Sequence, residues 1–156
     1  MIRAATPADV ATILRFVRDL AAFEREPDAV EATEATLAAA LFGTPPAAEA
    51  VIAEDDTGPL GFALFFHNFS TWKGRRGLYL EDLYVTPDAR GRGVGTALLR
   101  HLAALAVDRG CARFEWAVLD WNADAIAFYR QMGAIGLDEW TVQRVDGDAL
   151  VALAHR

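Results

Sequence analysis

The sequence predicts an α/β protein whose sheet is antiparallel in its middle. Three observations support this fold class. The chain has 156 residues, of which 53% are hydrophobic, so we expect residues 1–156 to form a single domain with a buried core. Three strand-like runs follow one another in the middle of the chain, separated by short turns. Segments with apolar residues at helical spacing lie before and after these runs.

The N-terminal part predicts one short strand followed by two helices. Residues 2–5 are expected to form the strand, and Thr6 then caps a helix that has Pro7 at its first position. A second helix begins after Thr33 and ends near Gly43. The apolar stripe of the first helix consists of Val10, Ile13, Leu14, Val17 and Leu20.

The middle of the chain predicts three consecutive strands, at residues 49–54, 60–69 and 78–85. The turn Asp55-Asp56-Thr57-Gly58 joins the first two as a hairpin. Two adjacent acids, Glu81 and Asp82, interrupt the third strand, which is otherwise apolar. Because side chains alternate along a strand, we expect one carboxylate on each face.

The C-terminal part predicts two further strands and three helices. The first helix follows a glycine-rich run and buries an apolar stripe. Asn122 is expected to cap the second helix, which ends at residue 131. The stripe of the first helix is Val94, Leu98, Leu102 and Leu105. The other elements are strands at 112–119 and 140–145 and a helix at 148–154.

Composition excludes several classes of protein. A net charge of −7 argues against non-specific nucleic-acid binding, which needs a basic face. No stretch approaches the roughly 20 apolar residues of a membrane span. The single cysteine, Cys111, cannot form an intrachain disulfide, which fits a cytoplasmic location. The three histidines lie far apart without flanking ligands, so no metal site is expected.

A glycine-rich run connects the strand at 78–85 to the next helix and reads Arg90-Gly91-Arg92-Gly93-Val94-Gly95-Thr96. Alternate glycines leave backbone N–H groups free to converge on an anion in front of a helix N-terminus. The two arginines add positive charge where a phosphate would lie. The spacing fits neither the Rossmann G-x-G-x-x-G pattern nor the P-loop. The alternative is a tight connection in which glycine only supplies backbone freedom.

This run resembles the R-x-x-G-x-G acetyl-CoA loop of the GNAT N-acetyltransferase superfamily. Residues 78–85 resemble the central strand of the spermidine/spermine (diamine) and thialysine N-acetyltransferases. The segment Asp120-Trp121-Asn122, followed by Phe128-Tyr129, is similar to the last motif of the same subfamily. The likeness extends over most of the chain.

The resemblance implies a mixed, largely antiparallel sheet with helices on both faces, splayed open beside residues 78–85, where acetyl-CoA inserts. Amides of the glycine-rich run, from Gly91 to Thr96, would receive the pyrophosphate. The pantetheine arm would bond the backbone of Leu83, Tyr84 and Val85. The next helix N-terminus would face the cofactor through Asn122, Asp124 and Ala125.

Acetyl transfer to an amine poses two proton problems. An alkylamine with a pKa of about 10 is mostly protonated at neutral pH, and the departing thiolate needs a proton. The resemblance implies that Tyr129 is the acid for the thiolate and that Glu81 relays the amine proton through water. The alternatives are a core aromatic for Tyr129 and, for either strand acid, an ion pair with a nearby arginine.

The acceptor site is expected to contain Phe23, Glu24, Trp72, Asp82 and Glu115, and the resemblance implies that the segment of Phe23 and Glu24 lies near the amine. A solvated helix end is the alternative for Glu24, and simple packing is the alternative for Trp72. Residues 68–77 are basic, where polyamine acetyltransferases carry acids. A small amine or amino acid therefore ranks above a long polycation as the acceptor.

Taken together, the sequence predicts an acetyl-CoA-dependent N-acetyltransferase of small primary amines that works by direct transfer in a ternary complex. One alternative acceptor is a peptide or protein amine. The alternative of another class is a sensor that binds acyl-CoA without catalysis. The resemblance further implies a homodimer.

Overall fold

The computed structural model describes residues 1–155 and divides into two compact units. Unit 1, Met1–Asp120, contains a five-stranded sheet in the order β1-β2-β3-β4-β5. Neighbouring strands are antiparallel, except that β4 and β5 are parallel. The strands are β1 (Ile2–Ala4), β2 (Glu49–Asp55), β3 (Gly58–Ser70), β4 (Arg75–Val85) and β5 (Phe114–Glu115).

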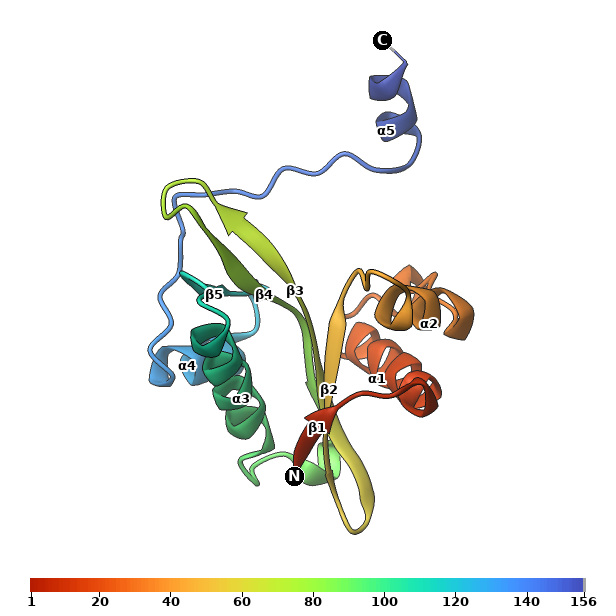
Figure 1. Cartoon of the computed structure of the whole chain (residues 1–156), viewed down its shortest axis with the longest axis vertical. Coiled ribbons are helices and arrows are strands. Elements are labelled where there is room, and N and C mark those ends of the chain that lie inside the picture. Colours follow the sequence, from red (N-terminus) through yellow and green to blue (C-terminus); the bar gives the residue numbers. More distant parts are fainter. Residues whose placement is uncertain (156) are drawn as a thin grey trace. The chain divides into compact units, whose positions relative to one another are not determined.

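Helices cover both faces of this sheet, as predicted. The helices α1 (Val10–Phe23) and α2 (Glu34–Phe42) lie on one face, and α3 (Val94–Asp108) lies on the other (Figure 1). On the α1 face, the ring of Phe16 packs against Phe62 of β3 and Tyr84 of β4, with centroids 5.7 and 5.4 Å away. The buried side chains of α3 are Leu98, Leu99, Leu102 and Ala106. The predicted α/β class is confirmed.

A β-bulge interrupts the pairing of β3 with β4. Leu64 pairs with Asp82, whereas Phe65 pairs with Leu80, so Glu81 is the extra residue of β4. A bulge bends its strand and re-aims nearby side chains. The strict alternation that underlay the expectation of one carboxylate on each face is therefore broken at the acidic pair itself.

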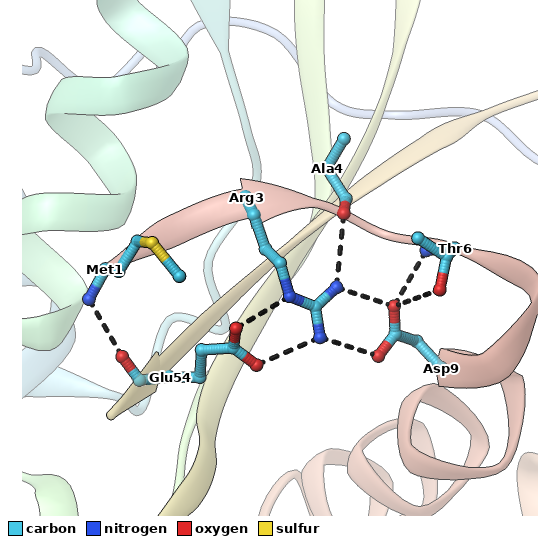
Figure 2. A network of polar contacts seen from close by, with 6 residues as sticks. All are labelled: Met1, Arg3, Ala4, Thr6, Asp9 and Glu54. Carbon is cyan, nitrogen blue, oxygen red and sulfur yellow. Dashed lines mark hydrogen bonds and ion pairs between the residues drawn. The ribbon is translucent and has the colours of Figure 1, made fainter. Parts of the chain in front are cut away.

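A network of ion pairs joins β1, β2 and the start of α1 (Figure 2). The Arg3 guanidinium donates to both carboxylate oxygens of Glu54 at 2.7 and 2.9 Å, and to both of Asp9 at 2.8 and 3.0 Å. Asp9 also accepts from the backbone N–H of Thr6 at 2.7 Å. These bonds hold the pKa of the Asp9 carboxyl at about 2, chiefly through Arg3.

Both N-terminal helices are present, and α2 follows the prediction closely. Thr33 caps α2, where its side chain accepts from Thr36, and the helix ends before Gly43. The helix after Thr6 begins differently, because residues Pro7–Asp9 form a 3-10 turn and α1 starts only at Val10. The carboxylate of Asp9 reaches back to Thr6 and tightens this first turn.

The strand predicted at 112–119 is shorter in the structure and covers only Phe114–Glu115. It pairs with β4 at Leu78 and Tyr79. A strand needs a hydrogen-bonded neighbour, and alternation of side chains alone does not supply one.

Unit 2 begins at Trp121 and contains α4 (Ala123–Gln131) and α5 (Gly147–Ala154), both predicted. The strand predicted at 140–145 is wrong, because this segment has no strand pairing within residues 1–155. Across those residues, no helix has the length and apolar character needed to span a membrane.

Candidate functional site

The glycine-rich run forms an open loop in front of α3. Gly91 and Gly93 have φ angles of 76° and 81°, in the left-handed region that favours glycine. A Cβ atom at either position would meet nothing within 4 Å, so the loop surface is uncrowded. Gly93 is the N-cap of α3 and offers no side chain to its first amides. The first turn of α3 therefore presents N–H groups toward the loop, a geometry suited to an anion.

Each arginine of the loop contacts another part of unit 1. The Arg90 Nε donates to the carbonyl of Val85 at 3.1 Å, and its guanidinium lies 5.5 Å from the centre of the Phe23 ring. The Arg92 Nη2 donates to a carboxylate oxygen of Asp55 in the β2–β3 hairpin at 2.9 Å. The contacts to Phe23 and Asp55 were not predicted from the sequence, because only the fold brings the end of α1 and the hairpin to the loop.

The strand before the loop has an unpaired edge. β5 pairs with β4 only at Leu78 and Tyr79, so within residues 1–155 the rest of β4 has a strand neighbour on the β3 side alone. Leu83, Tyr84 and Val85 lie on this part of β4. An exposed strand edge offers backbone donors and acceptors to an extended ligand.

Three carboxyl groups gather around the bulge of β4. The pKa of the Asp82 carboxyl is raised to about 6, chiefly by burial and in addition by the negative charges of Glu81 and Glu24. Glu24 is the C-cap of α1, and burial raises the pKa of its carboxyl as well. The structure thus brings together three of the predicted residues. Their mutual repulsion would be relieved by a cation placed among them.

The remaining acceptor candidates of unit 1 have different surroundings. Phe23 is 47% exposed and lies beneath the guanidinium of Arg90. Glu115 forms an ion pair with Arg113 at 2.8 Å. The pKa of the Tyr79 hydroxyl is raised chiefly by burial, and less by the charges of Glu81 and Glu115. Trp72 is 87% exposed in the turn between β3 and β4.

Unit 2 holds the other predicted residues. The side chain of Asn122 accepts from the amide of Ala125 at 3.3 Å, so Asn122 caps α4 as expected. Asp124 lies in the first turn of this helix. Tyr129 is half-buried, and its ring packs against that of Phe128 with centroids 5.5 Å apart. Across residues 1–155, no group of three or more His, Cys, Asp or Glu side chains is placed to share a metal ion.

Comparison with known proteins identifies the family to which this chain belongs. The Acetyltransferase (GNAT) family model matches residues 14–134. The chain belongs to this family and is an N-acetyltransferase, as the glycine-rich loop and the central strand predicted.

Two relatives and one solved structure illustrate the match. A thialysine N-epsilon-acetyltransferase of Bos taurus is 40% identical, over 100% of this chain and 98% of the relative. An L-ornithine N5-acetyltransferase of Arabidopsis thaliana is 33% identical, over 97% of this chain and 86% of its own length. The structure of an integron cassette protein from the mobile metagenome of V. cholerae superposes with a TM-score of 0.82 and 28% identity, covering 100% of this chain and 98% of that one.

Proposed function

We propose that this enzyme transfers the acetyl group of acetyl-CoA to the primary amine of a small cationic molecule, with a lysine-like amino acid ahead of diamines and polyamines. The observation that carries the proposal is the carboxyl cluster of Glu24, Glu81 and Asp82, which lies along β4 and the end of α1. The names of the relatives support it, since thialysine and ornithine are amino acids with a side-chain amine.

The residues of the loop fit the pyrophosphate of acetyl-CoA. Two left-handed glycines with open space around them let a phosphate approach the backbone closely. The backbone of Leu83, Tyr84 and Val85 would hold the pantetheine arm along the open edge of β4. Acetyl-CoA supplies the thioester, and Asn122, Asp124 and Ala125 at the start of α4 are the further cofactor residues of the proposal.

The carboxyl cluster would prepare the amine for attack. Asp82 and Glu24 hold the incoming ammonium group by charge, while Glu81 accepts its proton through water. The neutral nitrogen then attacks the thioester carbonyl, the new C–N bond forms, the nitrogen releases its second proton to solvent, and the C–S bond breaks. Tyr129 donates its phenolic proton to the departing thiolate and afterwards takes up a proton from solvent.

A panel of acceptors tests the proposal. Release of free thiol from acetyl-CoA would be followed with thialysine, lysine, ornithine, a short diamine and spermidine, with lysine-containing peptides that have a free N-terminus as a separate arm. We expect turnover with the amino acids and diamines and weaker turnover with spermidine.

Two results would contradict this outcome. Turnover with peptides alone would favour a protein acetyltransferase. Tight binding of acetyl-CoA without thiol release for any amine would favour a sensor.

We also propose a cytoplasmic homodimer. Unit 2 carries large apolar side chains that are at least half exposed, among them Trp140, Val142 and Val151, which a second copy would cover. The single cysteine supports a reducing compartment. Sedimentation equilibrium of the full chain tests the assembly, and a monomer at micromolar concentration would rule it out.

A further inference from the structure

Arg90 holds the first part of the acetyl-CoA loop through Val85 and Phe23, whereas the segment Gly91-Arg92-Gly93 has more backbone freedom. Arg92 lies between Gly91 and Gly93, which both have left-handed backbone and open space where a side chain would begin. Its own N–H reaches the carbonyl of Ala89 only at 3.4 Å. Glycines flanking a residue leave the chain more conformations to lose when a ligand binds. A contact from outside the loop would therefore reduce the conformations open to this segment before a ligand binds.

Asp55 supplies such a contact from the β2–β3 hairpin. Its Oδ2 accepts from Arg92 Nη2 at 2.9 Å, so the hairpin reaches the loop across 37 residues of sequence. Its Oδ1 accepts from both the backbone N–H of Thr57 at 2.8 Å and the Thr57 hydroxyl at 2.6 Å. Both carboxylate oxygens are thus engaged, and Thr57 fixes the direction in which Asp55 faces Arg92.

The hairpin that carries Asp55 is itself anchored. Glu54, the preceding residue, is held through Arg3 to Asp9 at the start of α1 (Figure 2). On the other strand of the hairpin, the Leu60 carbonyl accepts from the N–H of Thr86, just before the loop, at 2.8 Å. Asp55 therefore extends from a supported part of the sheet, which lets it restrain the loop.

We propose that Asp55 is a positioning residue for acetyl-CoA binding, which holds Arg92 so that the loop amides are arranged before the pyrophosphate arrives. The proposal rests on the proposed function, because it takes the loop as the pyrophosphate site. Asp55 does not touch the reacting atoms. Its effect is confined to the affinity for the cofactor, through the reduced ordering cost of a preorganised loop.

The test is the Asp55→Asn variant of the full chain, titrated with acetyl-CoA by calorimetry and assayed with the best amine. We expect the Kd for acetyl-CoA to rise about three- to ten-fold, with kcat at saturating acetyl-CoA unchanged. The matched control is Asp56→Asn, which removes the same charge from the same turn and should leave the Kd at the wild-type value. Thr57→Val should raise the Kd by a smaller factor.

Two further measurements separate positioning from other effects. Asp55→Asn should lose its difference from wild type as salt is raised, because the pair is exposed to solvent. The double variant Asp55→Asn/Arg92→Ala should bind no more weakly than Arg92→Ala alone. An unchanged urea midpoint would show that the loss is not one of folding.

The outcomes distinguish this proposal from the proposed function. If wild type binds acetyl-CoA and Asp55→Asn binds it equally or more tightly, Asp55 does not position the loop and the inference is overturned. If wild type itself does not bind acetyl-CoA, the proposed function fails first and the role of Asp55 fails with it.

Discussion

Two aspartates of unit 1 have pKa values shifted in opposite directions, although burial raises the pKa of both. Asp9 is 7% exposed and faces Arg3, which donates to both of its oxygens, and the pKa of its carboxyl is held at about 2. Asp82 is half-buried near Glu81 and Glu24, and the pKa of its carboxyl is raised to about 6. The same side chain is thus stabilised as an anion in one region and destabilised in the other.

The difference separates a structural acid from a functional one. Asp9 joins the start of α1 to the sheet, and its charge is compensated within the fold. The charge of Asp82 would be compensated by a cation from outside, which is what an ammonium substrate brings. A carboxyl whose pKa is raised by burial and by neighbouring acids is typical of a functional site, whereas a carboxylate held by a bidentate arginine pair has its charge compensated within the fold.

The largest expected effect is that of Asp82→Asn on acetyl transfer. The amide keeps the shape of the side chain but cannot attract the ammonium group, so kcat/KM for the amine should fall about 100-fold. The KM for acetyl-CoA should not change, and the free energy of unfolding should not fall. Steady-state kinetics and urea unfolding measure these quantities, with Asp56→Asn as the control for a lost surface charge.

A pH profile sharpens that result. In wild type, kcat/KM for the amine should fall on the acid side as pH drops through about 6, where Asp82 takes up its proton. This limb should disappear in Asp82→Asn. Glu81→Gln should also impair the amine side of the reaction and should retain the limb, moved to lower pH because a charge that raises the Asp82 pKa is removed. An effect of Glu81→Gln on the acetyl-CoA KM alone would contradict its role as the proton relay.

Much of the fold was predictable from local patterns in the sequence. Hairpin residues 55–58, the cap at Thr33 and the helical stripes act over a few positions, and each element they predict is present. The strands at 112–119 and 140–145 were overextended or wrong, because pairing depends on a distant partner. Alternation therefore predicted strands where the fold provides few or no partners.

The site was predictable in its components but not in its connections. The glycine-rich run and the adjacent acids of β4 were visible in the sequence, because both are unusual residues at recognisable positions. The bulge at Glu81 and the bond from Asp55 to Arg92 were not, since both depend on how separate segments meet. Adjacent acids in an apolar strand were the one signal that could have suggested a break in alternation.

The second expected effect is the loss of stability in Asp9→Asn. Removing the charge leaves Arg3 without a partner on that side, so the free energy of unfolding should fall by about 1–3 kcal/mol. Urea unfolding measures this loss. The kcat of the molecules that remain folded should equal that of wild type, and a variant with normal stability but impaired turnover would overturn the division between the two aspartates.

The pH dependence of stability should differ in sign for the two acids. The folded pKa of Asp9, about 2, lies below the ordinary 3.8, so its contribution is present above pH 4 and lost as pH falls through about 2. The folded pKa of Asp82, about 6, lies above 3.8, so its contribution is present below pH 4 and lost as pH rises through about 6. The Asp82→Asn variant should therefore lack the decline between pH 4 and 6.

The third expected effect is a loss of turnover in Tyr129→Phe, at the residue proposed to donate a proton. Tyr129→Phe removes the proposed acid for the thiolate, so kcat should fall ten-fold or more while the affinity for acetyl-CoA changes little. Calorimetry and steady-state rates separate the two quantities. Phe128→Leu, on the neighbouring ring, controls for a packing defect in α4. Unchanged turnover in Tyr129→Phe would remove Tyr129 from the mechanism.

The smallest effect is expected at Glu24, which lies at the end of α1 and contributes its charge to Asp82 from a distance. Glu24→Gln removes one of the two negative charges that oppose ionisation of Asp82, so the acid limb near pH 6 should move to lower pH. It also removes part of the field that attracts the ammonium group, so the KM for the amine should rise about three-fold. The control is Glu26→Gln, two residues further on and exposed. A limb that stays in place would show that Glu24 acts on the substrate alone.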